Sequence, residues 1–156
     1  IYFCRSTDGK DWSEPKKLND DETERGQFFP FVVVDKDGVV HVAWGDMRDD
    51  PSDTSYNIYY TRSEDCGDTF SPNMRVSDHP SNPMQGMPEF IGDYFGMAVG
   101  EDVYIAWVDC RYGPNGRANE DVVLARGEEF PEPRIEVSPK EGPSGCLLYT
   151  SPSPRD

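Results

Sequence analysis

The chain has 156 residues, including 14 Gly and 14 Pro, and its 30 acidic and 15 basic residues give a formal charge of −15. An excess of negative charge repels a phosphate backbone, which disfavours nucleic acid as a partner. No apolar run reaches 18 residues, so the sequence predicts no membrane span.

The predicted elements are short strands separated by turns, and no stretch shows a sustained helical periodicity. Asp35–Gly38 and Gly100–Asp102 are predicted hairpin turns, since their glycines can adopt a positive φ. In chain order the predicted strands are Ile1–Cys4, Phe31–Val34, Val39–Trp44, Asn57–Arg62, Met74–Ser77, Phe95–Val99, Val103–Trp107, Asp121–Arg126 and Arg134–Val137.

Internal repetition is the strongest signal in the sequence. Ser6 and Ser63 begin similar turn segments 57 residues apart, and Trp44 and Trp107 occupy similar strands 63 residues apart. Each interval has room for about four short strands. A series of small four-stranded sheets buries its faces by stacking, which is how β-propeller blades are arranged.

The repeat spacing predicts the following organisation. Residues 1–20 form the end of one blade, 21–78 a complete blade, 79–138 a further blade and 139–145 an unstructured segment, followed by the tail 146–156.

The tail 146–156 shares no periodicity with the preceding residues. It resembles the conceptual translation of a transposase-type sequencing adapter, and we expect it to be non-native. The alternative is a natural tail rich in Ser and Pro.

Two turn segments have the pattern of an Asp-box, Ser-x-Asp-x-Gly-x-Thr-aromatic, the first of them one residue shorter. In such a turn, Ser and Asp side chains bond to the local backbone, Gly supplies a left-handed residue, and the closing aromatic can fold back onto the sheet. We expect this work to be structural. The residues concerned are Ser6, Asp8, Gly9 and Trp12 in the first segment, and Ser63, Asp65, Gly67 and Phe70 in the second.

With its two Asp-boxes at blade spacing, the chain resembles the sialidase-like, or bacterial neuraminidase-repeat, β-propeller superfamily over residues 1–138. The resemblance implies an all-β fragment of a six-bladed β-propeller, with about two and a half four-stranded antiparallel blades. The remaining blades would then belong to the parent chain. It also implies an extracellular or cell-surface location.

In an up-and-down blade, successive loops alternate between the two ends of the sheet. The Asp-boxes should therefore lie at one end, and the segments that follow the second strands at the other, where the family has its active site. The candidate ligand-binding residues at this second end are Asp46, Arg48, Asp109 and Arg111. Because the Asp–Arg pair occurs in both units, a structural role for it is the competing interpretation.

The catalytic candidates form an incomplete set. A sialidase needs an arginine cluster for the substrate carboxylate and a Tyr nucleophile with an acidic partner. Tyr94, with Asp93 or Glu89 nearby, could supply only part of this set, and no Phe-Arg-Ile-Pro segment is present. Trp44 and Trp107 lie within strands and are predicted core residues.

Metal ligands are not indicated by the histidine or cysteine spacing. The acidic loop Asp46–Asp53 could in principle bind Ca²⁺, but acidity alone does not establish a site, and a solvated surface is the other interpretation. Outside the tail, Cys4, Cys66 and Cys110 form neither a disulfide framework nor a metal-binding pattern.

Two functions are therefore expected from the resemblance. The first is a non-catalytic propeller segment that binds glycans or a protein partner. The alternative is part of an exo-acting glycoside hydrolase of sialidase type.

Overall fold

The computed structural model describes residues 1–85, 90–110, 120–127, 138–140 and 147–150, the last two ranges as backbone only. The described part is all-β, with three small sheets and a single short 3₁₀ turn at Pro83–Gln85. None of its helices is long and apolar enough to cross a membrane.

The strands are β1 (Tyr2–Phe3), β2 (Lys16–Lys17), β3 (Gln27–Val34), β4 (Val40–Asp46), β5 (Asn57–Ser63), β6 (Met74–Arg75), β7 (Gly96–Val99), β8 (Val103–Asp109), β9 (Asp121–Gly127), β10 (Ser138–Lys140) and β11 (Leu147–Thr150). All of them except β2, β10 and β11 match predicted ones. β10 overlaps the segment 139–145, which is predicted to be unstructured, and β11 lies in the tail 146–156. The predicted strand Arg134–Val137 lies outside the described residues.

The central sheet has the order β3-β4-β5-β6, with every neighbouring pair antiparallel. Its first strand begins four residues earlier than predicted, because a bulge between Phe28 and Phe31 carries the pairing past Pro30. Phe29 has a positive φ of 50° in this bulge, and both Phe28 and Phe29 pack against the core. A bulge can re-aim side chains in this way.

The other two sheets differ in completeness. β1 and β2 form a two-stranded sheet, whereas β7, β8 and β9 form an antiparallel meander. β11 then pairs with β9 in parallel, and β10 pairs with β11. This parallel pairing departs from the up-and-down pattern of the central sheet.

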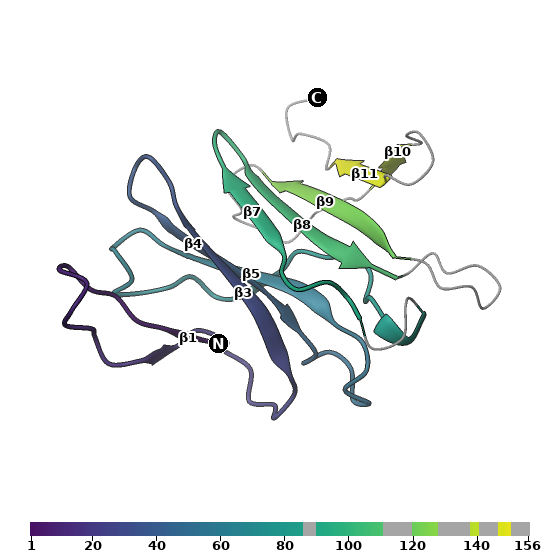
Figure 1. The fold of residues 1–156 in the computed structure, drawn as a ribbon, viewed down its shortest axis with the longest axis horizontal. Coiled ribbons are helices and arrows are strands. Elements are labelled where there is room, and N and C mark those ends of the chain that lie inside the picture. The colour runs from purple at the N-terminus through teal and green to yellow at the C-terminus, as the bar shows by residue number, and fades with distance from the viewer. Residues whose placement is uncertain (86–89, 111–119, 128–137, 141–146, 151–156) are drawn as a thin grey trace.

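The three sheets stack in chain order, with the central sheet between the other two (Figure 1). One face of the central sheet packs on the β7–β9 sheet and the opposite face on the β1–β2 sheet, since side chains alternate along β4. Ala43 belongs to the first interface, and Val42 and Trp44 to the second. β3 and β7, the first strands of the two larger sheets, are in contact.

Candidate functional site

The central sheet has two ends with different chemistry, fixed by its register. Asp46 pairs with Asn57 at one end, and Val40 pairs with Ser63 at the other. We call the first the Asp–Arg end and the second the Asp-box end. The register agrees with the predicted separation of the two motifs.

The Asp–Arg ends of the two larger sheets adjoin. Tyr56, the residue before β5, donates its hydroxyl hydrogen to the backbone oxygen of Val108, near the end of β8. The backbone N–H of Cys110 donates to Ser81 Oγ at 3.0 Å. The residues that follow β4 and β8 therefore lie on the same side of the stack.

Asp46 is fully buried at the end of β4. Its Oδ2 accepts the indole N–H of Trp44 at 2.7 Å, and its Oδ1 accepts the backbone N–H of Arg48 at 2.8 Å. Trp44 and Asp46 are two residues apart on a strand, so their side chains leave the same face. The carboxylate of Asp46 therefore lies beside the indole of Trp44, on the face of the central sheet that packs on the β1–β2 sheet.

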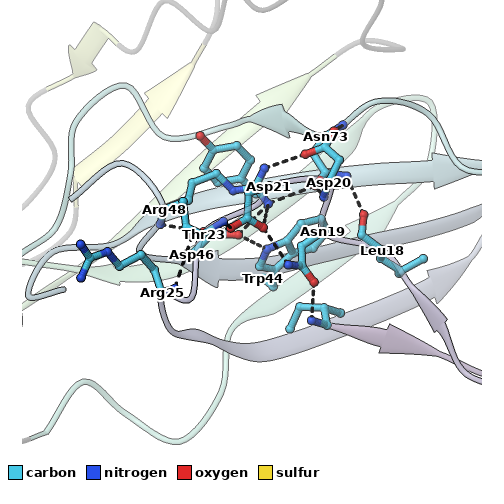
Figure 2. Close-up of polar contacts among 12 residues, drawn as sticks. Leu18, Asn19, Asp20, Asp21, Thr23, Arg25, Trp44, Asp46, Arg48 and Asn73 are labelled. Carbon is cyan, nitrogen blue, oxygen red and sulfur yellow. Dashed lines mark hydrogen bonds and ion pairs between the residues drawn. The ribbon is translucent and has the colours of Figure 1, made fainter. Parts of the chain in front are cut away.

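Arg48 binds acidic and amide oxygens from three segments (Figure 2). Its Nη2 donates to Asp46 Oδ2 at 2.8 Å and to Asn73 Oδ1 at 3.1 Å, and its Nη1 donates to Asp20 Oδ1 at 2.7 Å. Asp21 lies 3.5 Å from Nη2. We call these five residues the Arg48 cluster. They join the segment after β2 and the residue before β6 to the end of β4.

The guanidinium of Arg48 is also enclosed on its flat side. Its Cζ lies 4.2 Å from the centre of the Tyr59 ring, and only 10% of the side chain is exposed. A cation over an aromatic face is attracted by the ring quadrupole. Little of this group is therefore left to contact a ligand.

The charges in the Arg48 cluster shift its ionisation equilibria. Burial by itself lowers the pKa of Arg48, but the hydrogen bonds to Asp46 and Asp20 outweigh it and the pKa rises. Burial likewise acts to raise the pKa of Asp21, yet bonds from Asn19 and Thr23 and the Arg48 charge bring that pKa below its ordinary value. Both groups are held in their charged forms.

The second sheet repeats the Trp–Asp contact. The Trp107 indole N–H donates to Asp109 Oδ2 at 3.3 Å, and Asp109 is 1% exposed. Trp44 and Trp107 are themselves buried, which confirms the prediction that they are core residues. Arg111 lies outside the described residues.

Asp93 and Tyr94 precede β7 and are both exposed, Tyr94 to 76%. Neither forms a hydrogen bond with another residue of the described part of the chain. The next residue, Phe95, packs against Phe28 and Tyr56 beside the Asp–Arg end. Glu89 lies outside the described residues, so a Tyr–Glu pair is not placed.

The carboxylates of the acidic loop after β4 accept hydrogen bonds from different donors and do not converge on one point. Asp49 accepts from Asn57 and Tyr59, and Asp53 accepts the backbone N–H of Gly26. Asp50 accepts from the loop that follows it, chiefly from the Ser52 backbone N–H, and these bonds lower its pKa strongly. Among the described residues no group of three or more His, Cys, Asp or Glu could hold a metal ion. The calcium interpretation therefore has no geometric support there.

Both Asp-box turns have the expected local bonds. Ser6 Oγ accepts the Gly9 backbone N–H at 2.8 Å, and Ser63 Oγ accepts that of Gly67 at 2.7 Å. Gly9 and Gly67 have positive φ values of 73° and 90°. Asp8 accepts the backbone N–H groups of Lys10 and Asp11, and Asp65 accepts that of Thr69.

The second Asp-box also contacts the β1–β2 sheet, which precedes its own sheet in the chain. Arg5 Nη1 donates to the Cys66 backbone oxygen at 2.6 Å, and Lys16 Nζ donates to that of Gly67 at 3.1 Å. Phe3 and Phe70 pack edge to face with ring centres 5.2 Å apart. Trp12, the closing aromatic of the first turn, is 63% exposed and does not fold back onto a sheet among the described residues. No segment among the described residues buries the Trp12 side chain.

Sequence reasoning missed the partners of Arg48. Asp20, Asp21 and Asn73 are distant from it in sequence and belong to segments with no distinctive motif. A signal for the Trp–Asp contact was available, since Trp-x-Asp occurs twice on predicted strands and places both side chains on one face.

Comparison of the chain with family models, with curated proteins and with solved structures gave no match.

Proposed function

We propose that the chain is a segment of a sialidase-like β-propeller. Three features support the assignment: small antiparallel sheets stacked in chain order, contact between the first strands of neighbouring units, and two Asp-box turns at equivalent positions. In a propeller, such first strands line the central axis. An extracellular or cell-surface location follows from the family resemblance and is part of the same proposal.

We further propose that this segment is non-catalytic and contributes to binding a glycan. The non-catalytic part of this proposal rests on the enclosure of Arg48 by Asp46, Asp20 and Tyr59, and the binding part on the exposure of Tyr94. An arginine that binds a substrate carboxylate needs free N–H donors facing the ligand. Arg48 instead donates to the protein's own oxygens, so its role is to fasten three segments together.

The glycan-binding surface would lie at the Asp–Arg end, around Asp93 and Tyr94. An exposed phenol ring offers a flat apolar face with a polar tip, and an adjacent carboxylate accepts hydroxyl hydrogens. Sugars present both apolar C–H faces and hydroxyl groups. The exposure of Tyr94 also supports the second candidate, a glycoside hydrolase of sialidase type in which Tyr94 is the nucleophile.

Glycan-array binding and fluorogenic sialoside hydrolysis by the full-length protein separate these functions. Tyr94→Ala should weaken glycan binding by about tenfold or more. Trp12→Ala is the matched control, because Trp12 is also a largely exposed aromatic, 63% against 76% for Tyr94, and it lies at the Asp-box end. Glycan binding that is insensitive to Tyr94→Ala would reject this surface. Sialoside hydrolysis that is abolished by Tyr94→Phe would replace the binding role by the enzymatic one.

A further inference from the structure

An aspartate followed directly by glycine occurs twice in the chain, at Asp8–Gly9 and at Asp37–Gly38. Such a pair can close into a cyclic imide, because the glycine nitrogen lies close to the side-chain carboxyl carbon and no Cβ hinders its approach. Both pairs lie in exposed turns, the first in an Asp-box and the second between β3 and β4. The same reaction can therefore be compared at two sites with the same dipeptide.

The carboxylate of Asp8 is held by its Asp-box turn. Its Oδ1 accepts the backbone N–H groups of Lys10 and Asp11 at 2.9 and 3.0 Å and the hydroxyl hydrogen of Ser6 at 3.1 Å. The nitrogen of Gly9, which would be the nucleophile, donates to Ser6 Oγ at 2.8 Å. The bonds from Asp11, Lys10 and Ser6 lower the pKa of Asp8, so its carboxyl group stays ionised. An ionised carboxylate is a poorer electrophile than a carboxylic acid, so this turn opposes imide formation in two ways.

The carboxylate of Asp37 is held much less firmly. Within the described residues its hydrogen-bond partner is Lys36 Nζ at 2.6 Å, and the Asp37 and Lys36 side chains are 67% and 82% exposed. An exposed ion pair of this kind contributes little stability and breaks easily. The nitrogen of Gly38 donates to the backbone oxygen of Asp35 at 3.2 Å, at the long end of the range for such bonds. Freeing the reacting groups therefore costs less at Asp37 than at Asp8.

We propose that Asp37 is a site of spontaneous isoaspartate formation, whereas the Asp-box protects Asp8 from the same reaction. The Gly38 nitrogen attacks Asp37 Cγ and forms a C–N bond, while the amide proton and a carboxyl OH leave as water. The resulting succinimide then takes up one water. Hydrolysis at the former side-chain carbonyl restores aspartate, and hydrolysis at the main-chain carbonyl gives isoaspartate, with no oxidant or reductant. The reaction is independent of the proposed glycan binding.

Isoaspartate at position 37 adds one carbon to the backbone of the hairpin turn. Asp35 Oδ1 accepts the backbone N–H groups of both Asp37 and Val39, at 2.9 and 2.8 Å. The added carbon lies between these two donors, so they no longer reach the same oxygen together. The other carboxylate oxygen of Asp35 lies 3.4 Å from Nε2 of the buried His41. The modification therefore loosens the turn and alters a contact of β4.

Incubation of the folded full-length protein at neutral pH in water enriched in oxygen-18 measures the reaction at both sites. Each passage through the imide introduces one heavy oxygen, which peptide mass spectrometry locates, and electron-transfer fragmentation identifies the isoaspartate. Label should enter position 37 at least about tenfold faster than position 8, because several hydrogen bonds must break before Asp8 can react. Equal rates at the two sites, or a faster rate at Asp8, would overturn the proposal.

Variants and a denatured sample identify the cause of the difference. Asp37→Glu should stop labelling at position 37, because the imide ring would have to be larger, and should leave position 8 unchanged. Ser6→Ala removes the acceptor of the Gly9 N–H and one donor to Asp8, so labelling at position 8 should become about fivefold faster. In concentrated urea both sites should react at similar rates. An unchanged rate in Ser6→Ala, or unequal rates in urea, would reject protection by the Asp-box turn.

Discussion

Each end of the central sheet has an aspartate beside the end of a strand, but the two carboxylates differ in burial and in hydrogen-bond partners. At the Asp–Arg end, Asp46 is fully buried and bonds to an indole and to a guanidinium. At the Asp-box end, Asp65 is exposed and bonds to hydroxyl and backbone groups of its own turn.

The difference follows from the cost of burying charge. A buried carboxylate requires an opposite charge and complete hydrogen bonding, whereas an exposed one is already solvated and needs only local donors. Arg48 supplies the charge and in doing so joins three segments. Asp65 organises one turn, so changes at the two ends should differ in size.

Arg48→Met should have the largest effect. It leaves Asp46 buried without its ionic partner, and loss of one member of a buried pair costs about 3–5 kcal/mol. Urea unfolding of the full-length protein measures the change. The matched control is Arg62→Met, which removes a pair with the exposed Glu64 and should cost less than about 1 kcal/mol. Equal losses in the free energy of unfolding for the two variants would show that the Arg48 cluster does not stabilise the fold.

Gly67→Ala should have the second-largest effect on stability, and it allows the two Asp-box turns to be compared. A Cβ at Gly67 would overlap the Phe3 ring, and the alanine would have to adopt a left-handed backbone conformation. The two penalties together predict a loss of about 2–4 kcal/mol. Gly9→Ala is the control, because Gly9 has a similar φ but no atom within 4 Å, and it should cost about 1 kcal/mol. Thermal unfolding that fails to separate the variants would contradict the contact with the preceding sheet.

The smallest expected effect is on the stability of the protein at low pH. Hydrogen bonds from the Thr69 side chain and backbone and from Ser63 lower the pKa of Asp65 strongly, and backbone bonds from Asp11 and Lys10 lower that of Asp8. A folded-state pKa below the ordinary value of 3.8 contributes stability that is fully present above pH 3.8. This contribution is lost as the pH falls from 3.8 through the folded-state pKa. The free energy of unfolding should therefore decline below pH 3.8, and Asp65→Asn should flatten the decline.

Carboxyl carbon chemical shifts measure both titrations directly. We expect Asp65 to titrate below Asp8, because its shift is the larger. Two aspartates that titrate together near the ordinary value would contradict the hydrogen bonding of these turns.

Local features of the fold were predictable from the sequence. Strands β3 to β9, the hairpin turn at Asp35–Gly38 and the bonding within both Asp-box turns depend on side-chain alternation, on glycine and on short-range hydrogen bonds. These interactions involve residues within a few positions of one another. The predicted burial of Trp44 and Trp107 rests on the same alternation.

The surroundings of those features depend on contacts between segments that are distant in sequence. The enclosure of Arg48 depends on Asp20 and Asn73, which reach it because neighbouring segments fold together. The same stacking buries Gly67 against Phe3 but leaves Trp12 exposed, although both turns share one motif. The positions of the strands and turns could be predicted from the local sequence, since they depend on near neighbours. Stacking determined which charged and apolar side chains are enclosed, because their partners come from other sheets.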